Sequence, residues 1–302
     1  MIARNHSPEQ IMSNPAVSFA AAMLMLGTLG IFFHEAALAP VMTVFFRCAF
    51  GAAILLVYCA YKGMLKRSNV SPKNLMLALG SGILMCVNWV MFFEAIARVG
   101  ISVTTIVYHV QPFLVLIVGS LLLKESVSAN NIGWVVVGFA GLVLACGLRT
   151  DMALSSTYLI GIACTLGAAV AYAGVTLTTR AIRGMPPHLT ALTHCLTGTV
   201  LTAGFFSMPA GGIAAAQWGW LAGLGLIPTA LAYVMVYGAT PRMNTAVIAV
   251  LTFLYPAAAL VVDFVVYGHA IGALQLAGFA LIASATLGVN LQWHFFPSLK
   301  GA

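Results

Sequence analysis

Residues 92–123 read FFEAIARVGISVTTIVYHVQPFLVLIVGSLLL, a short polar turn followed by a long apolar segment with a central proline. Residues 237–267, YGATPRMNTAVIAVLTFLYPAAALVVDFVVY, repeat this layout at an offset of 144 residues. The offset aligns Arg98 with Arg242 and Pro112 with Pro256. Self-similarity at a fixed offset indicates that the chain contains two copies of one structural unit.

The composition sets the class of protein. Of the 302 residues, 62% are hydrophobic and only 6% are charged, and the mean hydropathy is +1.03. A soluble domain carries about 25% charged residues, so this chain cannot cover a globule with solvated side chains. The composition therefore excludes a soluble enzyme, a disordered protein and a nucleic-acid binder. The six cysteines form no CxxC motif and no Cys/His spacing typical of a metal site, so we expect neither a metal nor a cofactor.

The sequence predicts an all-α, polytopic membrane protein with ten transmembrane helices. A bilayer core requires roughly 20 apolar residues per helix. The first such segment is longer than the apolar part of a secretory signal peptide, so we expect it to be a retained helix. The ten expected segments are 15–33, 40–61, 75–97, 100–123, 131–148, 157–180, 187–208, 216–239, 243–266 and 271–293.

Five segments fall in each half, which predicts one repeat over residues 1–150 and a second over residues 151–302. Because five is an odd number, the second copy would enter the membrane in the opposite sense. Inverted repeats are typical of secondary transporters, whose substrate site lies near the bilayer midplane between the repeats.

The positions of Lys and Arg predict the orientation, since cytoplasmic connections are enriched in both. With the N-terminus inside, ten of the 13 fall on the inner side. Arg98 and Arg149 fall on the outer side, and Arg47 lies within the second segment. We therefore expect both termini to be cytoplasmic and the protein to lie in a bacterial inner membrane.

Several motifs together resemble those of a known family. They are Phe46-Arg47, Arg98-Val99-Gly100, Pro112, Pro256, and Leu123-Lys124-Glu125 before a Gly-rich segment at Gly133. This pattern, in two five-helix halves, resembles the drug/metabolite transporter (DMT) superfamily and, within it, the EamA-like exporters. The chain looks most like the aromatic amino acid exporter (YddG-type) branch, which implies amino acid export. It departs from the pattern at His194, near the second-half counterpart of Arg47, and at His269, where Glu is common.

Polar residues within the apolar segments mark a candidate substrate site, because they are costly in a bilayer. In the fourth segment, Thr104, Tyr108 and Gln111 are spaced to share one helical face. Pro112 and Pro256 would each free the carbonyl four residues earlier, on Tyr108 and Thr252, for a cavity. The alternative is a pair of packing kinks.

Further segments carry comparable faces. The sixth has a small and polar stripe that includes Tyr172 and predicts either a cavity wall or close helix packing. Aromatic side chains with a few polar tips suit a partly apolar small molecule. The full set of candidate substrate-binding residues is Asn88, Trp89, Thr104, Tyr108, His109, Gln111, Tyr172, Thr176, Tyr233, Thr252 and Tyr255.

Four charged residues are candidates for pairing or proton coupling. Glu94 and Arg98 are four residues apart, so we expect them to pair. Arg47 could snorkel outward, pair with Glu94 or Asp263, or cap carbonyls, whereas Asp263 is expected near an interface. His109 titrates near neutral pH, so it is either a proton carrier or a buried neutral ring.

The absence of a central acidic residue or basic cluster favours a net-neutral substrate. We therefore predict a transporter that exports aromatic and other neutral amino acids and related amphiphilic metabolites by alternating access. The alternative is efflux of multiple drugs or quaternary cations, which aromatic faces bind through their rings. No hydrolase motif is present, so we do not expect an enzyme. The expected partners are the small-molecule substrate and the lipid bilayer, and the chain is expected to be a monomer or a weak homodimer.

Overall fold

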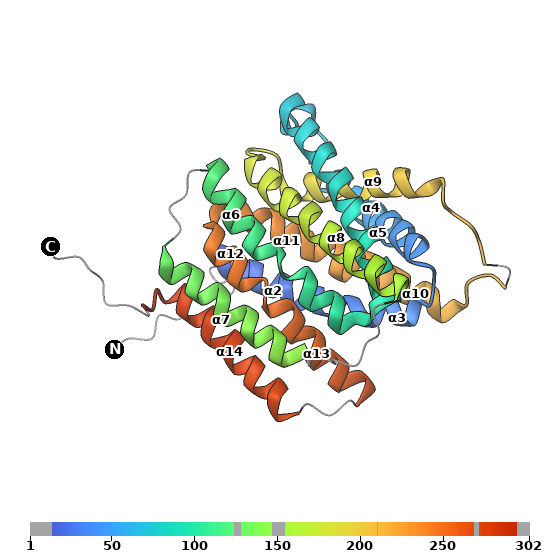
Figure 1. The fold of residues 1–302 in the computed structure, drawn as a ribbon. Helices are drawn as coiled ribbons and strands as arrows, with labels where there is room; N and C mark the ends of the chain where they lie inside the picture. The colour runs from blue at the N-terminus through green and yellow to red at the C-terminus, as the bar shows by residue number, and fades with distance from the viewer. Residues whose placement is uncertain (1–13, 124–127, 147–154, 210, 269–271, 295–302) are drawn as a thin grey trace, which may run out of the picture.

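The computed structural model describes residues 14–123, 128–146, 155–209, 211–268 and 272–294, and every regular element in these ranges is helical (Figure 1). The first half contains α2 (Pro15–Gly27), α3 (Leu29–Ala36), α4 (Pro40–Tyr61), η1 (Arg67–Asn69), α5 (Pro72–Tyr108), α6 (Gln111–Leu123) and α7 (Ala129–Cys146). The second half contains α8 (Ser156–Ala181), α9 (Pro187–Ala203), α10 (Ala215–Gly225), η2 (Leu226–Leu231), α11 (Ala232–Ala239), η3 (Thr240–Arg242), α12 (Thr245–Leu251), α13 (Leu254–Tyr267) and α14 (Ala273–Asn290).

Helices lie on all ten predicted segments. Six are long and apolar enough to cross a membrane: Pro15–Ala36, Pro40–Tyr61, Pro72–Ile101, Ser156–Ala181, Ala215–Arg242 and Thr245–Tyr267. Large apolar side chains cover the outer surface, and Val57, Val170 and Val200 are each more than 60% exposed. Such a surface suits lipid rather than water, so the fold is that of a multi-pass membrane protein. The number of ten crossings stays a prediction.

The helix starts follow from local chemistry. Pro40 and Pro72 occupy first-turn positions, where the missing proline N–H has no helical partner to lose. Side chains cap other orphan amides: Ser71 Oγ accepts from Asn74 N at 3.2 Å, and Ser155 Oγ accepts from Tyr158 N at 3.1 Å.

Several segments are broken where the periodicity predicts one continuous helix. The first is divided at Thr28, whose hydroxyl donates to the Met25 carbonyl. The third and fourth predicted segments lie on either side of Gly100, whose non-helical φ of +79° interrupts α5 and bends its path. Pro228 lies within η2, a turn of π-helix, because proline cannot supply the amide for a regular α-helical bond.

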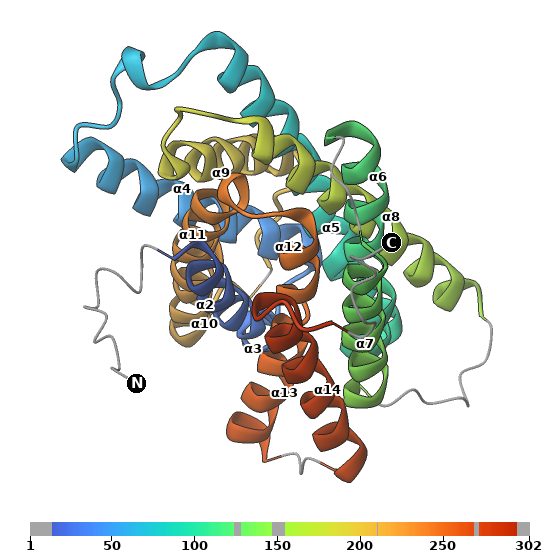
Figure 2. The same ribbon diagram turned by 90° about the vertical axis from the view of Figure 1, so that its left-hand side faces the viewer.

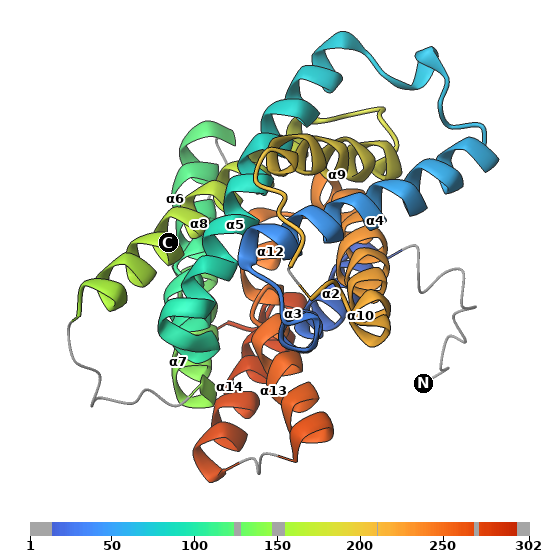
Figure 3. The same ribbon diagram turned by 90° about the vertical axis from the view of Figure 1, so that its right-hand side faces the viewer.

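The helices form two groups. In Figures 2 and 3, α2, α4, α10 and α11 lie toward one side of the molecule, and α5, α6, α7 and α8 lie toward the other. Trp89 in α5 and Tyr233 in α11 meet between the groups, where Trp89 Nε1 donates to the Tyr233 hydroxyl at 3.1 Å. These two residues are 144 positions apart, so the contact joins equivalent positions of the predicted repeats. The inverted repeat stays a prediction, and this contact supports it.

Two glycines of α7, Gly138 and Gly141, lie in close contact with other parts of the chain. A Cβ built on Gly141 would lie 2.7 Å from the Gly278 carbonyl oxygen in α14, and one built on Gly138 would lie 2.6 Å from the Phe253 ring. Close approach of two backbones requires glycine at such positions. These two glycines therefore let α7 pack closely against α14 and against Phe253.

Candidate functional site

Aromatic residues from both halves line a small central cavity, the aromatic chamber. Its volume is about 50 Å³, which holds a few water molecules at roughly 10–15 Å³ each. Seven of its residues were predicted from the sequence: Asn88, Trp89, Tyr108, Tyr172, Tyr233, Thr252 and Tyr255. The other four, Met23, Leu26, Leu29 and Phe92, complete the wall. The three from α2 and α3 were missed because ordinary apolar residues carry no signal of a site.

Hydrogen bonds hold the chamber's polar groups in place. Asn88 Nδ2 donates to the Tyr108 hydroxyl at 3.0 Å and to the Ala168 carbonyl at 2.8 Å. The Tyr108 and Tyr172 rings lie 6.0 Å apart, and the Phe92 ring meets Tyr108 edge-on at 4.9 Å. The chamber is therefore a cage of rings with few polar tips, which suits a molecule with one aromatic or aliphatic part.

A narrow neck leads from the chamber to a larger basic vestibule. The neck, of about 10 Å³, shares Tyr172 and Thr252 with the chamber and also contains the predicted residue Thr176. The basic vestibule, of about 310 Å³, shares Thr179 and Tyr237 with the neck, and its lining includes Arg183 and Arg242. The three cavities therefore follow one another from the helix ends to the middle of the molecule.

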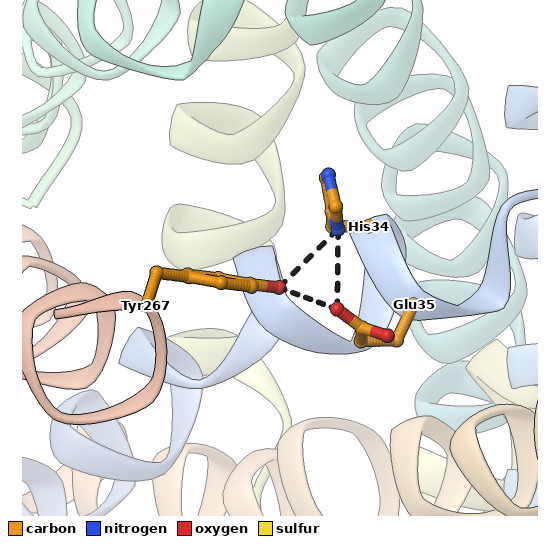
Figure 4. Close-up of polar contacts among 3 residues, drawn as sticks. All are labelled: His34, Glu35 and Tyr267. Atoms are coloured by element: carbon orange, nitrogen blue, oxygen red, sulfur yellow. Dashed lines mark hydrogen bonds and ion pairs between the residues drawn. The ribbon is translucent and has the colours of Figure 1, made fainter. Parts of the chain in front are cut away.

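A second large cavity, the apolar vestibule, adjoins the end of α2 and α3 and shares no lining residue with the chamber. It measures about 370 Å³ and is lined by α2, α3, the Gly100 bend of α5, and α13. The Tyr267 hydroxyl donates to Glu35 Oε1 at 2.8 Å and lies 3.2 Å from His34 Nδ1 (Figure 4). We call His34, Glu35 and Tyr267 the latch, because they join α3 to α13 beside this vestibule.

Arg47 lies behind the chamber wall and is fully buried. Its Nε donates to Thr229 Oγ1 at 3.1 Å, and its guanidinium carbon lies 4.3 Å from the centre of the Trp89 ring. The Thr229 hydroxyl in turn donates to the Leu224 carbonyl at 2.7 Å. The π-helical turn at Pro228 therefore provides the acceptor that positions Arg47, a link that the sequence pattern did not reveal.

His194 lies in a buried hydrogen-bond chain that was not predicted. Ser81 Oγ donates to the Leu77 carbonyl at 2.7 Å, so it accepts from His194 Nε2 at 2.8 Å. His194 Nδ1 then accepts from the Tyr237 hydroxyl at 2.7 Å. This network assigns a neutral imidazole that fixes Tyr237 at the joint between the neck and the basic vestibule.

Three of the predicted site residues do not line these cavities. The Thr104 hydroxyl donates to the Gly100 carbonyl at 2.8 Å, across the bend of α5. His109 Nδ1 donates to the Thr105 carbonyl at 2.6 Å, and its ring stacks on Phe253 and Tyr255. Gln111 is buried at the start of α6. Gln111 does not continue the expected face of Thr104 and Tyr108, because the helix breaks between Tyr108 and Gln111.

The two prolines mark breaks between helices rather than smooth kinks. Pro112 is the second residue of α6, and Pro256 is the third residue of α13. The Thr252 carbonyl, which was expected to be free, accepts from Tyr255 N at 3.2 Å in a tight turn. The Thr252 carbonyl is therefore less available to a ligand than the position of Pro256 predicts.

The charges outside the chamber have simple local roles. Arg98 donates to Glu94 Oε2 at 3.2 Å, the contact that their spacing predicts, so Glu94 is not the partner of Arg47. The side chain of Asp263 lies outside the described part of the structure, as does His269.

Comparisons with known proteins agree with this architecture. The sequence profile of the EamA-like transporter family matches twice, over residues 15–147 and 159–291. Uncharacterized transporter YxxF of Bacillus subtilis (strain 168) is 26% identical over 272 residues, which cover 89% of this chain and 87% of the relative. A protein of known crystal structure superposes with a TM-score of 0.80 at 18% identity, covering 92% of this chain and 96% of its own, and so shares the fold. The chain belongs to the EamA-like transporter family of the drug/metabolite transporter superfamily.

Proposed function

We propose that this transporter exports aromatic and other neutral amino acids, and related amphiphilic metabolites, through the aromatic chamber by alternating access. The branch we assign is that of the aromatic amino acid exporters. The observation that carries the proposal is the run of cavities from the basic vestibule through the neck to a chamber lined with rings.

The size of the chamber supports alternating access. A volume of about 50 Å³ cannot hold an amino acid with an aromatic side chain, whereas each vestibule is at least six times larger. A substrate that crosses the molecule must therefore separate the rings of the chamber. The tight neck and the latch are the two constrictions that would open in turn.

The charge along the route supports a zwitterion over a cation. Among the residues that the structure describes, no Asp or Glu lines any of the four cavities. Arg183 and Arg242 line the basic vestibule, and Arg47 lies against the chamber wall. A net positive drug would meet an unfavourable potential at each of these points.

Efflux of lipophilic cations is the second candidate, and the rings of the chamber favour it. Six aromatic side chains line the chamber, and ring faces attract cations within about 6 Å. The guanidinium of Arg47 already occupies one face of Trp89, which weakens this alternative.

We place the protein in a bacterial inner membrane with both termini in the cytoplasm. Arg180, Arg183 and Arg242 lie at the ends of helices beside the basic vestibule. Since cytoplasmic connections are enriched in Lys and Arg, we assign the basic vestibule to the cytoplasmic side and the latch to the outer side.

Flux into proteoliposomes tests the proposal directly. Radiolabelled Phe, Trp, Tyr, Met and Thr, and one lipophilic dication, are offered to vesicles with and without the purified protein. The proposal predicts protein-dependent flux of several amino acids and none of the dication. Flux of the dication alone supports the second candidate, and no flux of any amino acid by folded protein refutes the proposal.

A further inference from the structure

Arg47 is a cation held in the membrane interior with two of its three nitrogens unused. Its side chain is 0% exposed, its Nε donates to Thr229 Oγ1, and the Tyr233 hydroxyl lies near the guanidinium. The two terminal nitrogens, Nη1 and Nη2, are buried and have no hydrogen-bond partner among the described residues. The guanidinium lies over the rings of Trp89 and Phe93, at 4.3 and 5.6 Å from their centres.

Such an arrangement is unfavourable unless a ligand completes it. A buried charge requires a partner or several hydrogen bonds, because desolvation of the ion costs several kcal/mol. Ring contacts supply only part of this. Among the described residues, the two ion pairs are His34–Glu35 and Arg98–Glu94, so no described carboxylate neutralises Arg47.

The indole ring of Trp89 separates the unused nitrogens of Arg47 from the chamber. Trp89 contacts the guanidinium on its ring face and also lines the chamber, and its Nε1 donates to Tyr233, which lines the chamber as well. The chamber must expand to admit a substrate. Movement of the Trp89 ring away from Arg47 would enlarge the chamber and open the guanidinium to it in one step.

We infer that Arg47 is the carboxylate-recognition residue of the transporter and that Trp89 is its movable cover. The ligand class is a small molecule with a carboxylate beside an apolar group. A guanidinium binds a carboxylate through two parallel N–H bonds, which matches the two free terminal nitrogens. This inference rests on the proposed function and narrows its substrate class to carboxylates.

Three ligands that share a phenylethyl skeleton and differ in their charged groups test the inference. Phenylalanine carries both charges, 3-phenylpropanoate lacks the ammonium group, and phenethylamine lacks the carboxylate. Each competes for labelled phenylalanine on wild-type protein, Arg47→Gln and Arg98→Gln in proteoliposomes. Arg98→Gln is the matched control, because it removes the same charge from the ion pair with Glu94 outside the chamber.

We expect wild type to bind phenylalanine and 3-phenylpropanoate roughly tenfold or more tightly than phenethylamine, since charged hydrogen bonds are lost with the carboxylate. Arg47→Gln should abolish this preference, and Arg98→Gln should keep it. The preference is a ratio, so it does not depend on the amount of folded protein.

Two results overturn the inference while the proposed function survives. In one, the wild-type protein transports phenylalanine but binds phenethylamine as tightly as phenylalanine. This result is measured on wild-type protein alone and does not depend on the folding of a variant. The other is an Arg47→Gln protein that keeps the wild-type ratio. A folded wild-type protein that moves no amino acid refutes the proposed function itself, and this inference with it.

Discussion

Tyr237 is the residue at which the basic vestibule meets the neck, and its hydroxyl is the only donor available to His194 Nδ1 among the described residues. His194 and Ser81 are both buried, so a lost hydroxyl cannot be replaced by bulk water. The position of Tyr237 therefore depends on a chain of three side chains from α5, α9 and α11.

Tyr237→Phe tests this chain. The variant leaves the imidazole nitrogen of His194 unpaired, which should lower the free energy of unfolding by roughly 1–3 kcal/mol. Thermal unfolding in detergent measures the loss. Tyr61→Phe is the control, because Tyr61 is 83% exposed and should change stability by less than about 0.5 kcal/mol. Equal stability of the two variants would contradict the role of the chain.

At the scale of single residues, the sequence identified residues that line the chamber better than it identified the hydrogen-bond partners of buried side chains. Asn88, Tyr108 and Tyr172 stood out because polar tips within apolar segments are costly, and all three line the chamber. The partners of Arg47 and His194 depend on the register between distant helices, which one sequence does not contain. Thr104 shows the limit of the approach, since its hydroxyl bonds to the carbonyl four residues earlier.

At the scale of the helices, backbone geometry explains the breaks that shape the cavities. Most helix positions could be predicted, because hydrophobic length sets them. The break between Tyr108 and Gln111 and the π-helical turn at Pro228 could not, whereas the interruption at Gly100 lies at the predicted boundary between the third and fourth segments. Gly and Pro permit several backbone geometries, and tertiary packing selects among them.

Gly141→Ala tests the close packing of α7 on α14. The added methyl group would lie 2.7 Å from the Gly278 carbonyl oxygen and 2.9 Å from Leu281 Cβ, so the helices must move apart. We expect a loss of roughly 1–3 kcal/mol in unfolding free energy. Gly80→Ala, in α5 with open space around it, should be neutral or stabilising by about 0.5–1 kcal/mol. A stable Gly141→Ala protein would contradict the packing.

Gly100→Ala tests the bend of α5. No heavy atom lies within 4 Å of the new methyl group, so the cost comes from the positive φ of 79° alone. With a ψ of 166°, Gly100 lies in a backbone region that is almost restricted to glycine, so the cost is about 1–3 kcal/mol for a residue with a side chain and should appear in chemical unfolding. Gly204→Ala, at a φ of −67° and also in open space, is the matched control. Equal effects at the two glycines would show that the bend is not a constraint.

At the scale of the whole molecule, the two vestibules and the closed chamber predict that α3 and α13 separate during each cycle. His34 and Tyr267 face one another across the latch, with ring centres 5.5 Å apart (Figure 4). A short bifunctional thiol reagent on a His34→Cys, Tyr267→Cys protein without native cysteines should therefore stop amino acid flux. Each single variant, treated alike, should keep its flux. Full flux through the cross-linked protein would exclude opening at the latch.

The central claim is that the substrate passes through the aromatic chamber. Single cysteines at Tyr108, Tyr172 and Thr252, in a protein without native cysteines, are labelled with a water-soluble maleimide in the presence and absence of phenylalanine. Val170, 61% exposed on the outer face of α8, is the lipid-facing control. We predict that the three chamber positions are labelled and that phenylalanine protects them, whereas Val170→Cys is not labelled. Labelling that phenylalanine leaves unchanged at all three positions, in a protein that still transports it, would contradict the account.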